Sequence, residues 1–347
     1  MSPETLGGSA PSAGAGVGSR GRPSSPALTP PEILLAALQR RVAETVVGYQ
    51  SVVRLLSVAL VSEGHVLLEG VPGIAKTLLV RCFADSLALS FKRIQFTPDM
   101  LPSDIVGSLV LNPTSRAFEY RKGPVFANVV LADEINRAPP KVQSALLESM
   151  QERQVTVDGV GYPLPRPFIV IATQNPIEQE GTYPLPEAEL DRLLFRILMG
   201  YPSEADERTL VRLHSDVPPV RQVGPLVDAA VLESFQQQVA PVYCSEDVLD
   251  YIVQLLRATR DDRRIMVGAS PRAGVQLARA AKAEAMWAGR NYVTPEDVRS
   301  IAFWVLNHRV ALHPELLAQQ YVEGGIGTEP VVREVMSDLF DRLPAPR

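Results

Sequence analysis

The sequence contains only two cysteines, Cys82 and Cys244, among its 347 residues. They lie far apart and lack the spacing of metal ligands, so the sequence indicates neither a disulfide framework nor a zinc site. We expect both to be buried thiols of a protein in a reducing compartment. The four histidines show no metal-ligand grouping either, and we expect them to lie in the core or on the surface: His65, His214, His308 and His313.

Lysine is also scarce, because only five of the 34 basic residues are lysines. The formal net charge of −5, without a basic stripe carrying interleaved aromatics, argues against nucleic acid as a partner. No apolar run reaches the length of a membrane span, and the first residues lack the apolar segment of a secretory signal. We therefore expect a cytoplasmic protein with no nucleic-acid partner and no membrane span.

Three regions differ in their pattern. Residues 1–30 are mostly Ser, Gly, Pro and Ala, which is typical of a disordered tail. Residues 31–215 alternate apolar runs with helical periodicity, which predicts an α/β domain with a parallel five-stranded sheet between helices. Residues 216–347 predict an all-α domain, with the boundary near "VPPVRQVGPL".

The α/β region yields specific elements. Buried strands are expected at 65–70, 92–96, 129–134, 168–176 and 195–202, and helices at 31–42, 51–62, 76–90, 139–154 and 186–194. The first helix is expected to carry Ile33, Leu34, Leu38 and Val42 on one side. Alternating residues predict hairpins around "NPTS" at 112–115 and around Asp158-Gly159. From Ser203 onward only helices are expected: 203–214, 228–239, 245–260, 270–288, 295–309 and 328–342.

The stretch "EGVPGIAKTLLV" matches most of the phosphate-loop pattern G-x-x-x-x-G-K-[ST]. Gly70, Lys76 and Thr77 occupy their expected positions, but Ala75 replaces the glycine before the lysine. Glycine is favoured there because the backbone approaches the ligand closely, sometimes at positive φ. Alanine is the smallest departure, and Gly73 keeps the loop flexible. Taken alone, the stretch also fits a plain turn that leads into a surface helix.

Two further strands end in polar residues. "VVLADE" places Asp133 and Glu134 after a buried strand, where Asp133 could hold magnesium and Glu134 could orient the attacking water. "IVIATQN" ends in Thr173, Gln174 and Asn175, and an amide there could contact the γ-phosphate. Because such sheets bind ligands at the carboxyl ends of their strands, the three motifs together predict an ATP and Mg²⁺ site.

With these motifs the chain resembles the MoxR family of AAA+ ATPases from about Val46 to Arg309. The segments that carry the resemblance include "VVGYQ", "GVPGIAKT", "RIQFTPDMLPSDIVG", "FANVVLADEINRAPPKVQSALLESMQERQ" and "GASPRA". The family's loop likewise has alanine before the lysine, which favours a working nucleotide site. The resemblance implies an AAA+ P-loop domain with a helical lid, ATP hydrolysis in a ring that is commonly hexameric, and a chaperone-like action on a protein client. It also implies a partner that contains a von Willebrand factor A domain.

The resemblance also implies roles for individual residues. Catalysis would involve Lys76, Glu134, the first sensor Asn175, the arginine finger Arg192 that reaches a neighbouring subunit, and the second sensor Arg272. Thr77 and Asp133 would hold the metal. The nucleotide would contact Val47, Gly48, Gly70, Pro72, Gly73, Ile74, Ala75, Lys76, Thr77 and Leu78. The two hairpins would face the axis of the ring.

Plainer roles remain open for the arginines. Arg192 could pair with Glu189 on a helix surface, and Arg196 is a rival for the finger. Arg137 could contact a neighbouring subunit or simply begin a helix, and Arg272 could cap its helix near Ser270. Two other functions also remain open. One is an ATP-binding scaffold or switch with little turnover, and the other is a DNA-acting AAA+ motor.

Overall fold

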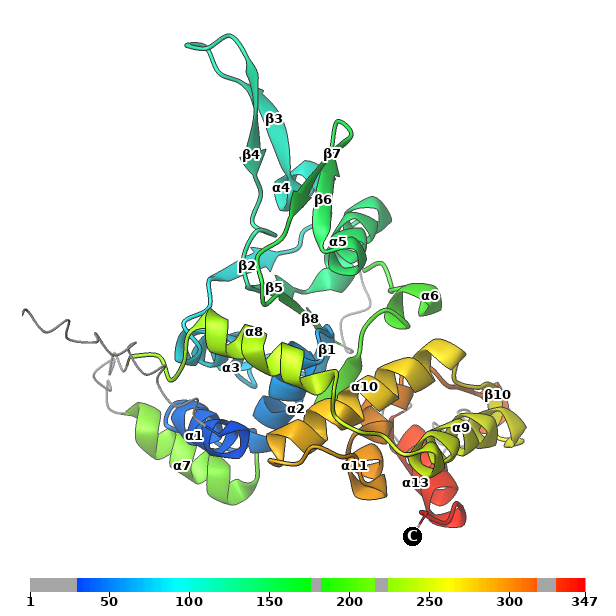
Figure 1. Cartoon of the computed structure of the whole chain (residues 1–347). Helices are drawn as coiled ribbons and strands as arrows, with labels where there is room; N and C mark the ends of the chain where they lie inside the picture. Colours follow the sequence, from blue (N-terminus) through cyan, green and yellow to red (C-terminus); the bar gives the residue numbers. More distant parts are fainter. Residues whose placement is uncertain (1–29, 176–181, 216–223, 317–328, 347) are drawn as a thin grey trace, which may run out of the picture.

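The computed structural model describes residues 30–175, 182–215, 224–316 and 329–346. The expected disordered tail therefore lies outside the described residues, except for Pro30. The N-terminal part is an α/β domain, and the helices after residue 224 form the lid (Figure 1).

A five-stranded parallel sheet forms the centre of the α/β domain, as the sequence predicts. Its order is β2 (Phe91–Gln95), β5 (Val129–Asp133), β8 (Ile169–Gln174), β1 (Val66–Gly70) and β9 (Phe195–Met199). Alternate residues of the strands face two separate hydrophobic clusters, since Leu68 and Leu131 belong to one cluster and Leu67 and Val130 to the other. This alternation follows from the two-residue period of a strand, and it explains why β1 and β5 are apolar on both faces.

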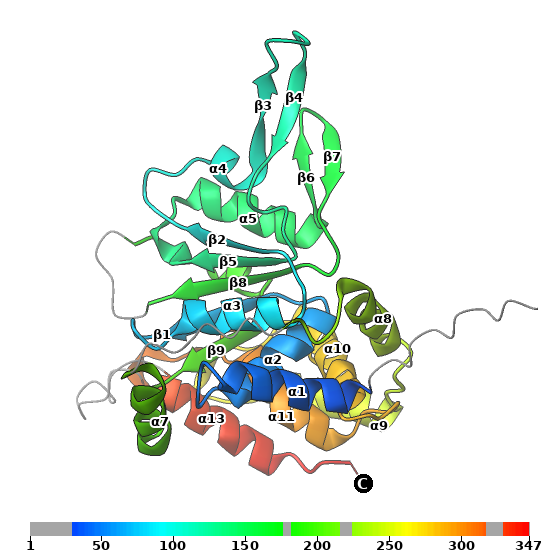
Figure 2. The same cartoon turned by 90° about the vertical axis from the view of Figure 1, so that its left-hand side faces the viewer.

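Helices cover both faces of the sheet (Figure 2). The elements on and around it are α1 (Pro31–Ala43), α2 (Gln50–Val61), α3 (Lys76–Ser86), α4 (Pro102–Val106), the 3₁₀ turn η1 (Ile135–Arg137), α5 (Pro140–Glu152) and α6 (Glu187–Leu190). Three details of the prediction are wrong. Ile33 points to solvent with 53% exposure while Leu34 packs in the core, α3 ends at Ser86 instead of residue 90, and α6 spans one turn only.

Both predicted hairpins are present. They are β3 (Gly107–Leu111) with β4 (Phe118–Lys122), and β6 (Gln154–Val157) with β7 (Val160–Pro163). They project together from the end of the α/β domain that lies away from the lid (Figures 1 and 2). The rings of Tyr120 and Tyr162 lie 4.3 Å apart between centroids, so the hairpins contact each other.

The remaining helices are α7 (Glu204–Ser215), α8 (Ala229–Val239), α9 (Glu246–Asp261), α10 (Pro271–Trp287), α11 (Pro295–Leu306) and α13 (Glu329–Arg342). Hydroxyls of Ser245, Ser270 and Thr294 cap α9, α10 and α11. The expectation that no strand follows Ser203 is wrong, because β10 (Ile265–Val267) pairs antiparallel with β11 (Ala311–Leu312). Strands of two and three residues are too short to show an alternating pattern.

The lid is continuous with the core beneath the sheet. Buried residues of α1, α2 and α3 belong to the same hydrophobic cluster as those of α8 to α11 and α13. Cys82 and Cys244 are free thiols, but both are half-buried, so the expectation of fully buried thiols is wrong. Burial raises the pKa of both thiols, which disfavours the reactive thiolate. Among the described residues, no helix is long and apolar enough to span a membrane.

Candidate nucleotide site

The phosphate loop connects β1 to α3 and is shaped by its small residues. A Cβ at Gly70 would lie 2.6 Å from the carbonyl oxygen of Met199, so only glycine fits there. Gly73 has φ of +87°. Ala75 adopts the left-handed conformation (φ 63°, ψ 27°) at the N-cap of α3. The backbone therefore makes at Ala75 the turn for which glycine is usual, at a strain cost of about 1 kcal/mol.

The side chains of the loop are arranged around the N-terminus of α3. The ammonium of Lys76 donates hydrogen bonds to the carbonyls of Gly70 and Val71, the second at 3.2 Å, so it lies over its own loop. Pro72, Gly73 and Leu78 are exposed. Ile74 is buried and anchors the loop to the core beneath the sheet. The N-terminus of α3 and the loop amides together form a setting that favours phosphate.

The carboxyl end of β5 lies beside this loop. Asp133 accepts a hydrogen bond from the Thr77 hydroxyl at 3.3 Å and another from the Thr173 hydroxyl at 2.6 Å. Thr77 and Asp133 thus offer a hydroxyl and a carboxylate oxygen side by side, which is the hard oxygen donor set that Mg²⁺ prefers. These two residues fit the expected metal position.

Glu134 also has an unusual backbone, with φ 58° and ψ 50°. Left-handed backbone is rare for glutamate, and such outliers concentrate at functional sites. The N–H of Glu134 donates to the Thr173 hydroxyl at 2.9 Å. Its carboxylate accepts from Gln95 at 2.9 Å and pairs with Arg137 at 3.0 Å. The strained turn and its three partners fix the carboxylate at the edge of the sheet.

Two residues of β2 at this edge were not predicted as site residues. Arg93 pairs with Asp133 at 2.7 Å, and Gln95 contacts Glu134 as described. β2 is the neighbour of β5, with Gln95 opposite Asp133 in register. The sequence signal is the polar side chains at alternate positions of a short strand, "KRIQF". Arg93 would compete with a metal for Asp133, and Gln95 holds the carboxylate of Glu134 by a hydrogen bond.

Two more predicted contacts reach the same edge. Asn175 follows β8 directly and is buried. The segment with Val47 and Gly48 lies at the carboxyl end of β9, because the neighbouring Tyr49 donates its hydroxyl to the carbonyl of Gly200 at 3.0 Å. Since Gly70 is opposite Met199 in register, this segment lies next to the phosphate loop.

Arg192 and Arg272 lie elsewhere. Both line a cavity of about 150 Å³ together with Gly64 and His65, which precede β1. The structure therefore places them at the amino end of β1, whereas the phosphate loop begins at its carboxyl end. Among the described residues, neither guanidinium forms a hydrogen bond or an ion pair, and the alternative pairing of Arg192 with Glu189 is not formed.

Other charged groups around that cavity are paired. Glu63 bridges Arg153 and Arg279. Burial would raise the pKa of Glu63, but hydrogen bonds and charge from these arginines outweigh it and lower the pKa. Arg196, the rival for the finger, pairs with Glu69 within the same chain. Of the four arginines considered for an interface, Arg137 and Arg196 are thus engaged by carboxylates of their own subunit.

The two buried histidines are structural. The His65 ring accepts from the N–H of Val170 at 3.0 Å and contacts the carbonyl of Met150 at 3.2 Å. Burial lowers the pKa of His65 to about 4, so the ring is neutral at pH 7. His308 is buried as well, and burial lowers its pKa. Groups of three or more metal-ligating side chains are absent from the described parts of the chain.

A parallel sheet with a phosphate loop after its first strand, paired acids after its third and a helical lid defines an AAA+ ATPase. Comparisons with known proteins agree. The family described as "ATPase family associated with various cellular activities (AAA)" matches residues 65–195, and the AAA lid domain matches 257–326. The chain is 45% identical to YeaC of Bacillus subtilis over 90% of this chain and 96% of that protein.

It is also 44% identical to the chaperone MoxR1 of Mycobacterium tuberculosis, over 87% of this chain and 81% of that protein. A crystal structure from Cytophaga hutchinsonii, provisionally described as an ATPase, superposes with a TM-score of 0.82 at 41% identity and covers 91% of this chain and 96% of that one. The chain belongs to the MoxR family of AAA+ ATPases.

Proposed function

We propose that this ATPase works as a ring in which each nucleotide site is completed by the next subunit. The observation that carries the proposal is the separation of the predicted site residues to opposite ends of β1. Lys76, Thr77 and Asp133 gather at the carboxyl end, whereas Arg192 and Arg272 face one cavity at the amino end.

The length of β1 supports action across an interface. Val66 and Gly70 are four residues apart, which corresponds to roughly 13 Å along a strand. Arg192 and Arg272 therefore serve the nucleotide of a neighbouring copy better than their own, and the second sensor acts in trans like the finger. Contacts of this head-to-tail kind close into a ring when the rotation between subunits permits.

Within each site the chain's residues have distinct tasks in this proposal. The loop amides and Lys76 hold the phosphates of ATP, and Thr77 and Asp133 hold Mg²⁺, which neutralises phosphate charge when bound. Arg93 must leave Asp133 for this. Glu134 orients and polarises the attacking water, and Asn175 contacts the γ-phosphate. Arg192 of the neighbour stabilises the charge that develops on the transferred group.

We propose protein remodelling as the use of this energy. The hairpins expose apolar side chains, including Phe118 with 69% exposure, at the end of the molecule opposite the lid. Such side chains suit contact with a protein client. The relative from Mycobacterium tuberculosis is named a chaperone. A hexameric ring, a partner with a von Willebrand factor A domain, a cytoplasmic location and domain limits of 31–215 and 216–347 complete the proposal by resemblance and sequence pattern.

Mixing two inactive variants tests the trans arrangement. Glu134→Gln lacks the water-orienting carboxylate but keeps Arg192, and Arg192→Ala has the reverse defect. If each site uses its neighbour's arginine, about a quarter of the interfaces in an equal random mixture carry both groups, so phosphate release recovers. Arg257→Ala, an exposed arginine of α9, is the control and is expected to be active alone.

Other outcomes identify the alternatives. A mixture as inactive as its components shows that Arg192 acts in its own subunit, and an Arg192→Ala variant that is active alone shows that Arg192 has no catalytic role. Equal phosphate release by the wild type and Glu134→Gln indicates an ATP-binding scaffold. Stimulation of ATP hydrolysis by DNA, together with salt-sensitive DNA binding, indicates a DNA-acting motor.

A further inference from the structure

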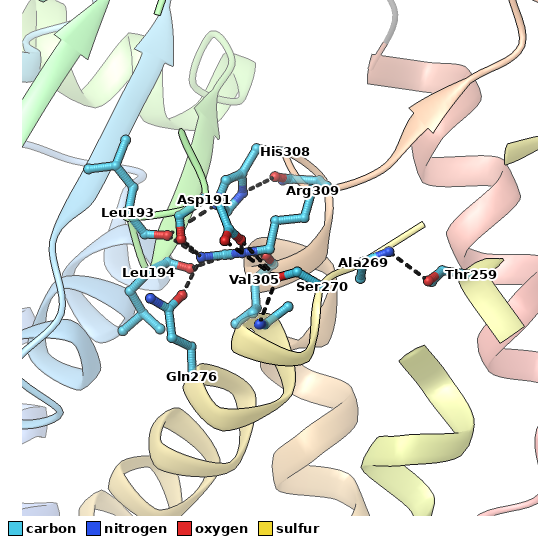
Figure 3. Close-up of polar contacts among 12 residues, drawn as sticks. Asp191, Leu193, Leu194, Thr259, Ala269, Ser270, Gln276, Val305, His308 and Arg309 are labelled. Atoms are coloured by element: carbon cyan, nitrogen blue, oxygen red, sulfur yellow. Dashed lines mark hydrogen bonds and ion pairs between the residues drawn. The ribbon is translucent and has the colours of Figure 1, made fainter. Parts of the chain in front are cut away.

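The lid holds the segment around Arg192 through one buried arginine, Arg309, which follows α11. Its side chain is only 1% exposed. The Nε of Arg309 donates to the Asp191 carboxylate at 2.8 Å, and its terminal nitrogens donate to the carbonyls of Asp191, Leu193 and Leu194 (Figure 3). The same terminal nitrogens also donate to the carbonyl of Val305 and to the side-chain oxygen of Gln276. One guanidinium thus fixes the backbone on both sides of Arg192.

Asp191 connects the same segment to α10. The hydroxyl of Ser270, the N-cap of α10, donates to the Asp191 carboxylate at 3.2 Å (Figure 3). Arg272 lies two residues beyond Ser270. The carboxylate therefore ties the residue before Arg192 to the first turn of the helix that carries Arg272.

Leu193 and Leu194 pack in the two hydrophobic clusters, but the segment borders a pocket on the side of Asp191. This pocket is a cavity of about 410 Å³ and is lined by Asp191, Ser270 and Arg309 among others. Protein interiors are normally filled, so a segment next to a cavity of this size is held on that side by its polar contacts. Directional hydrogen bonds therefore fix the position of the segment around Arg192 on this side.

The energetics favour a specific geometry over simple stability. Burial lowers the pKa of Arg309 to about 10, although the hydrogen bond and charge of Asp191 raise it. The guanidinium stays charged at pH 7, and burying that charge costs much of what the pair gains. An ion pair with a buried guanidinium contributes little net stability, but removing the carboxylate leaves that buried charge unpaired. A fixed geometry is what the pair supplies.

We propose that Arg309 is a positioning residue: by clamping Asp191 and the carbonyls around it, Arg309 makes Arg192 and Arg272 move as one unit with the lid. This inference rests on the proposed role of Arg192 in the neighbour's site. A lid that moves with its own nucleotide then carries the finger with it, so the state of one site reaches the next.

A double-mutant cycle on the full-length ring tests the clamp. Arg309→Gln is expected to lower kcat about 10²-fold, since a misplacement of about 1 Å has such effects, with nucleotide affinity within twofold of the wild type. In the Arg192→Ala background the same change is expected to add less than twofold. An equal loss in both backgrounds, or a parallel loss of nucleotide affinity, overturns the clamp. An Arg192→Ala variant with normal activity refutes the proposed function instead.

A milder pair of variants covers the case in which Arg309→Gln does not fold. Ser270→Ala and Ser245→Ala each remove one serine N-cap with a 3.3 Å hydrogen bond, but only Ser270 contacts Asp191. Ser270→Ala is expected to lower kcat about fivefold, which corresponds to one lost hydrogen bond. Ser245→Ala should leave kcat at the wild-type value, and Ser270→Thr should restore kcat because its hydroxyl can replace that of serine. Equal effects of the two alanine variants overturn the proposal.

Hydrogen exchange gives a readout that does not depend on activity. The peptide with Leu193 and Leu194 is expected to exchange faster in Ser270→Ala than in Ser245→Ala, because the clamp on its carbonyls is loosened. Unchanged exchange in that peptide speaks against the clamp even if kcat falls.

Discussion

The two ends of β1 are built in different ways. At the carboxyl end, short motifs that follow successive strands meet around Asp133, and the backbone is strained at Ala75 and Glu134. At the amino end, segments more than a hundred residues apart are joined by the ion pair of the half-buried Asp191 with the buried Arg309. In the proposed mechanism, the groups for ATP hydrolysis come from motifs that are local in the sequence, whereas the groups that connect one site to the next are held by long-range contacts. Three experiments can break or sharpen this comparison.

The largest effect is expected at the carboxyl end. Glu134→Gln removes the carboxylate that we propose to polarise the attacking water, so ATP hydrolysis is expected to fall by about 10²–10⁴ while ATP stays bound. Phosphate release and binding of a fluorescent nucleotide measure the two properties. Glu152→Gln, at the exposed end of α5, is the matched control and should hydrolyse normally. Normal ATP hydrolysis by Glu134→Gln would show that this carboxylate does not take part in the reaction.

An intermediate effect is expected at the amino end, where His65 precedes β1. Its pKa falls from 6.5 in the unfolded chain to about 4 on folding, so the unfolded state binds more protons between these values. The stability that the neutral ring provides is complete above pH 6.5 and is lost as the pH falls towards 4. The share of His65 in this loss corresponds to about 2 kcal/mol in the free energy of unfolding at pH 5.

Chemical denaturation at pH 7 and pH 5 measures it. His65→Gln should lose about 2 kcal/mol less than the wild type between these two values. His313→Gln, on the exposed surface, serves as the control. An unchanged pH dependence in His65→Gln would show that the amino end does not depend on a neutral imidazole.

The smallest effect is expected at Ala75. Glycine relieves the strain of the left-handed conformation but makes the unfolded chain more flexible, so Ala75→Gly should stabilise the protein by about 0.5 kcal/mol. Ala36→Gly, at an exposed position within α1, should destabilise it by about 1 kcal/mol. Thermal unfolding distinguishes the two signs. A destabilised Ala75→Gly would show that the carboxyl end stores no strain at this residue.

Much of the nucleotide site could be predicted because each motif directly follows a strand. Lys76 and Glu134 stand after apolar runs, and the ends of parallel strands meet at one edge. Arg93 and Gln95 were missed because they lie within a strand, where polar residues normally face solvent. Their contact with the acids depends on β2 being the neighbour of β5, which no local pattern shows.

The sequence predicts most helices and strands of the fold, but it predicts fewer of the contacts between them. The order of strands and helices follows from periodicity, but β10 and β11 are too short to leave an alternating pattern. Arg309 was missed because its partner Asp191 lies 118 positions away, and neither residue stands in a recognisable motif. Ile33 and Leu34 were both expected on the apolar side of α1, but adjacent residues of a helix point about 100° apart, and only Leu34 packs in the core.

The five residues of β1 have a consequence for how such an enzyme is regulated. In the proposed ring, Arg192 and Arg272 lie one strand length from the nucleotide of their own chain. Dilution should therefore abolish ATP hydrolysis, because a separated copy has no neighbour to supply these arginines to its site. A cell could then set the activity through the amount of protein that it makes. It follows that a copy with a defective Arg192 should silence only the neighbouring site that it fails to complete, so we expect the activity of mixed assemblies to fall in proportion to the share of the variant.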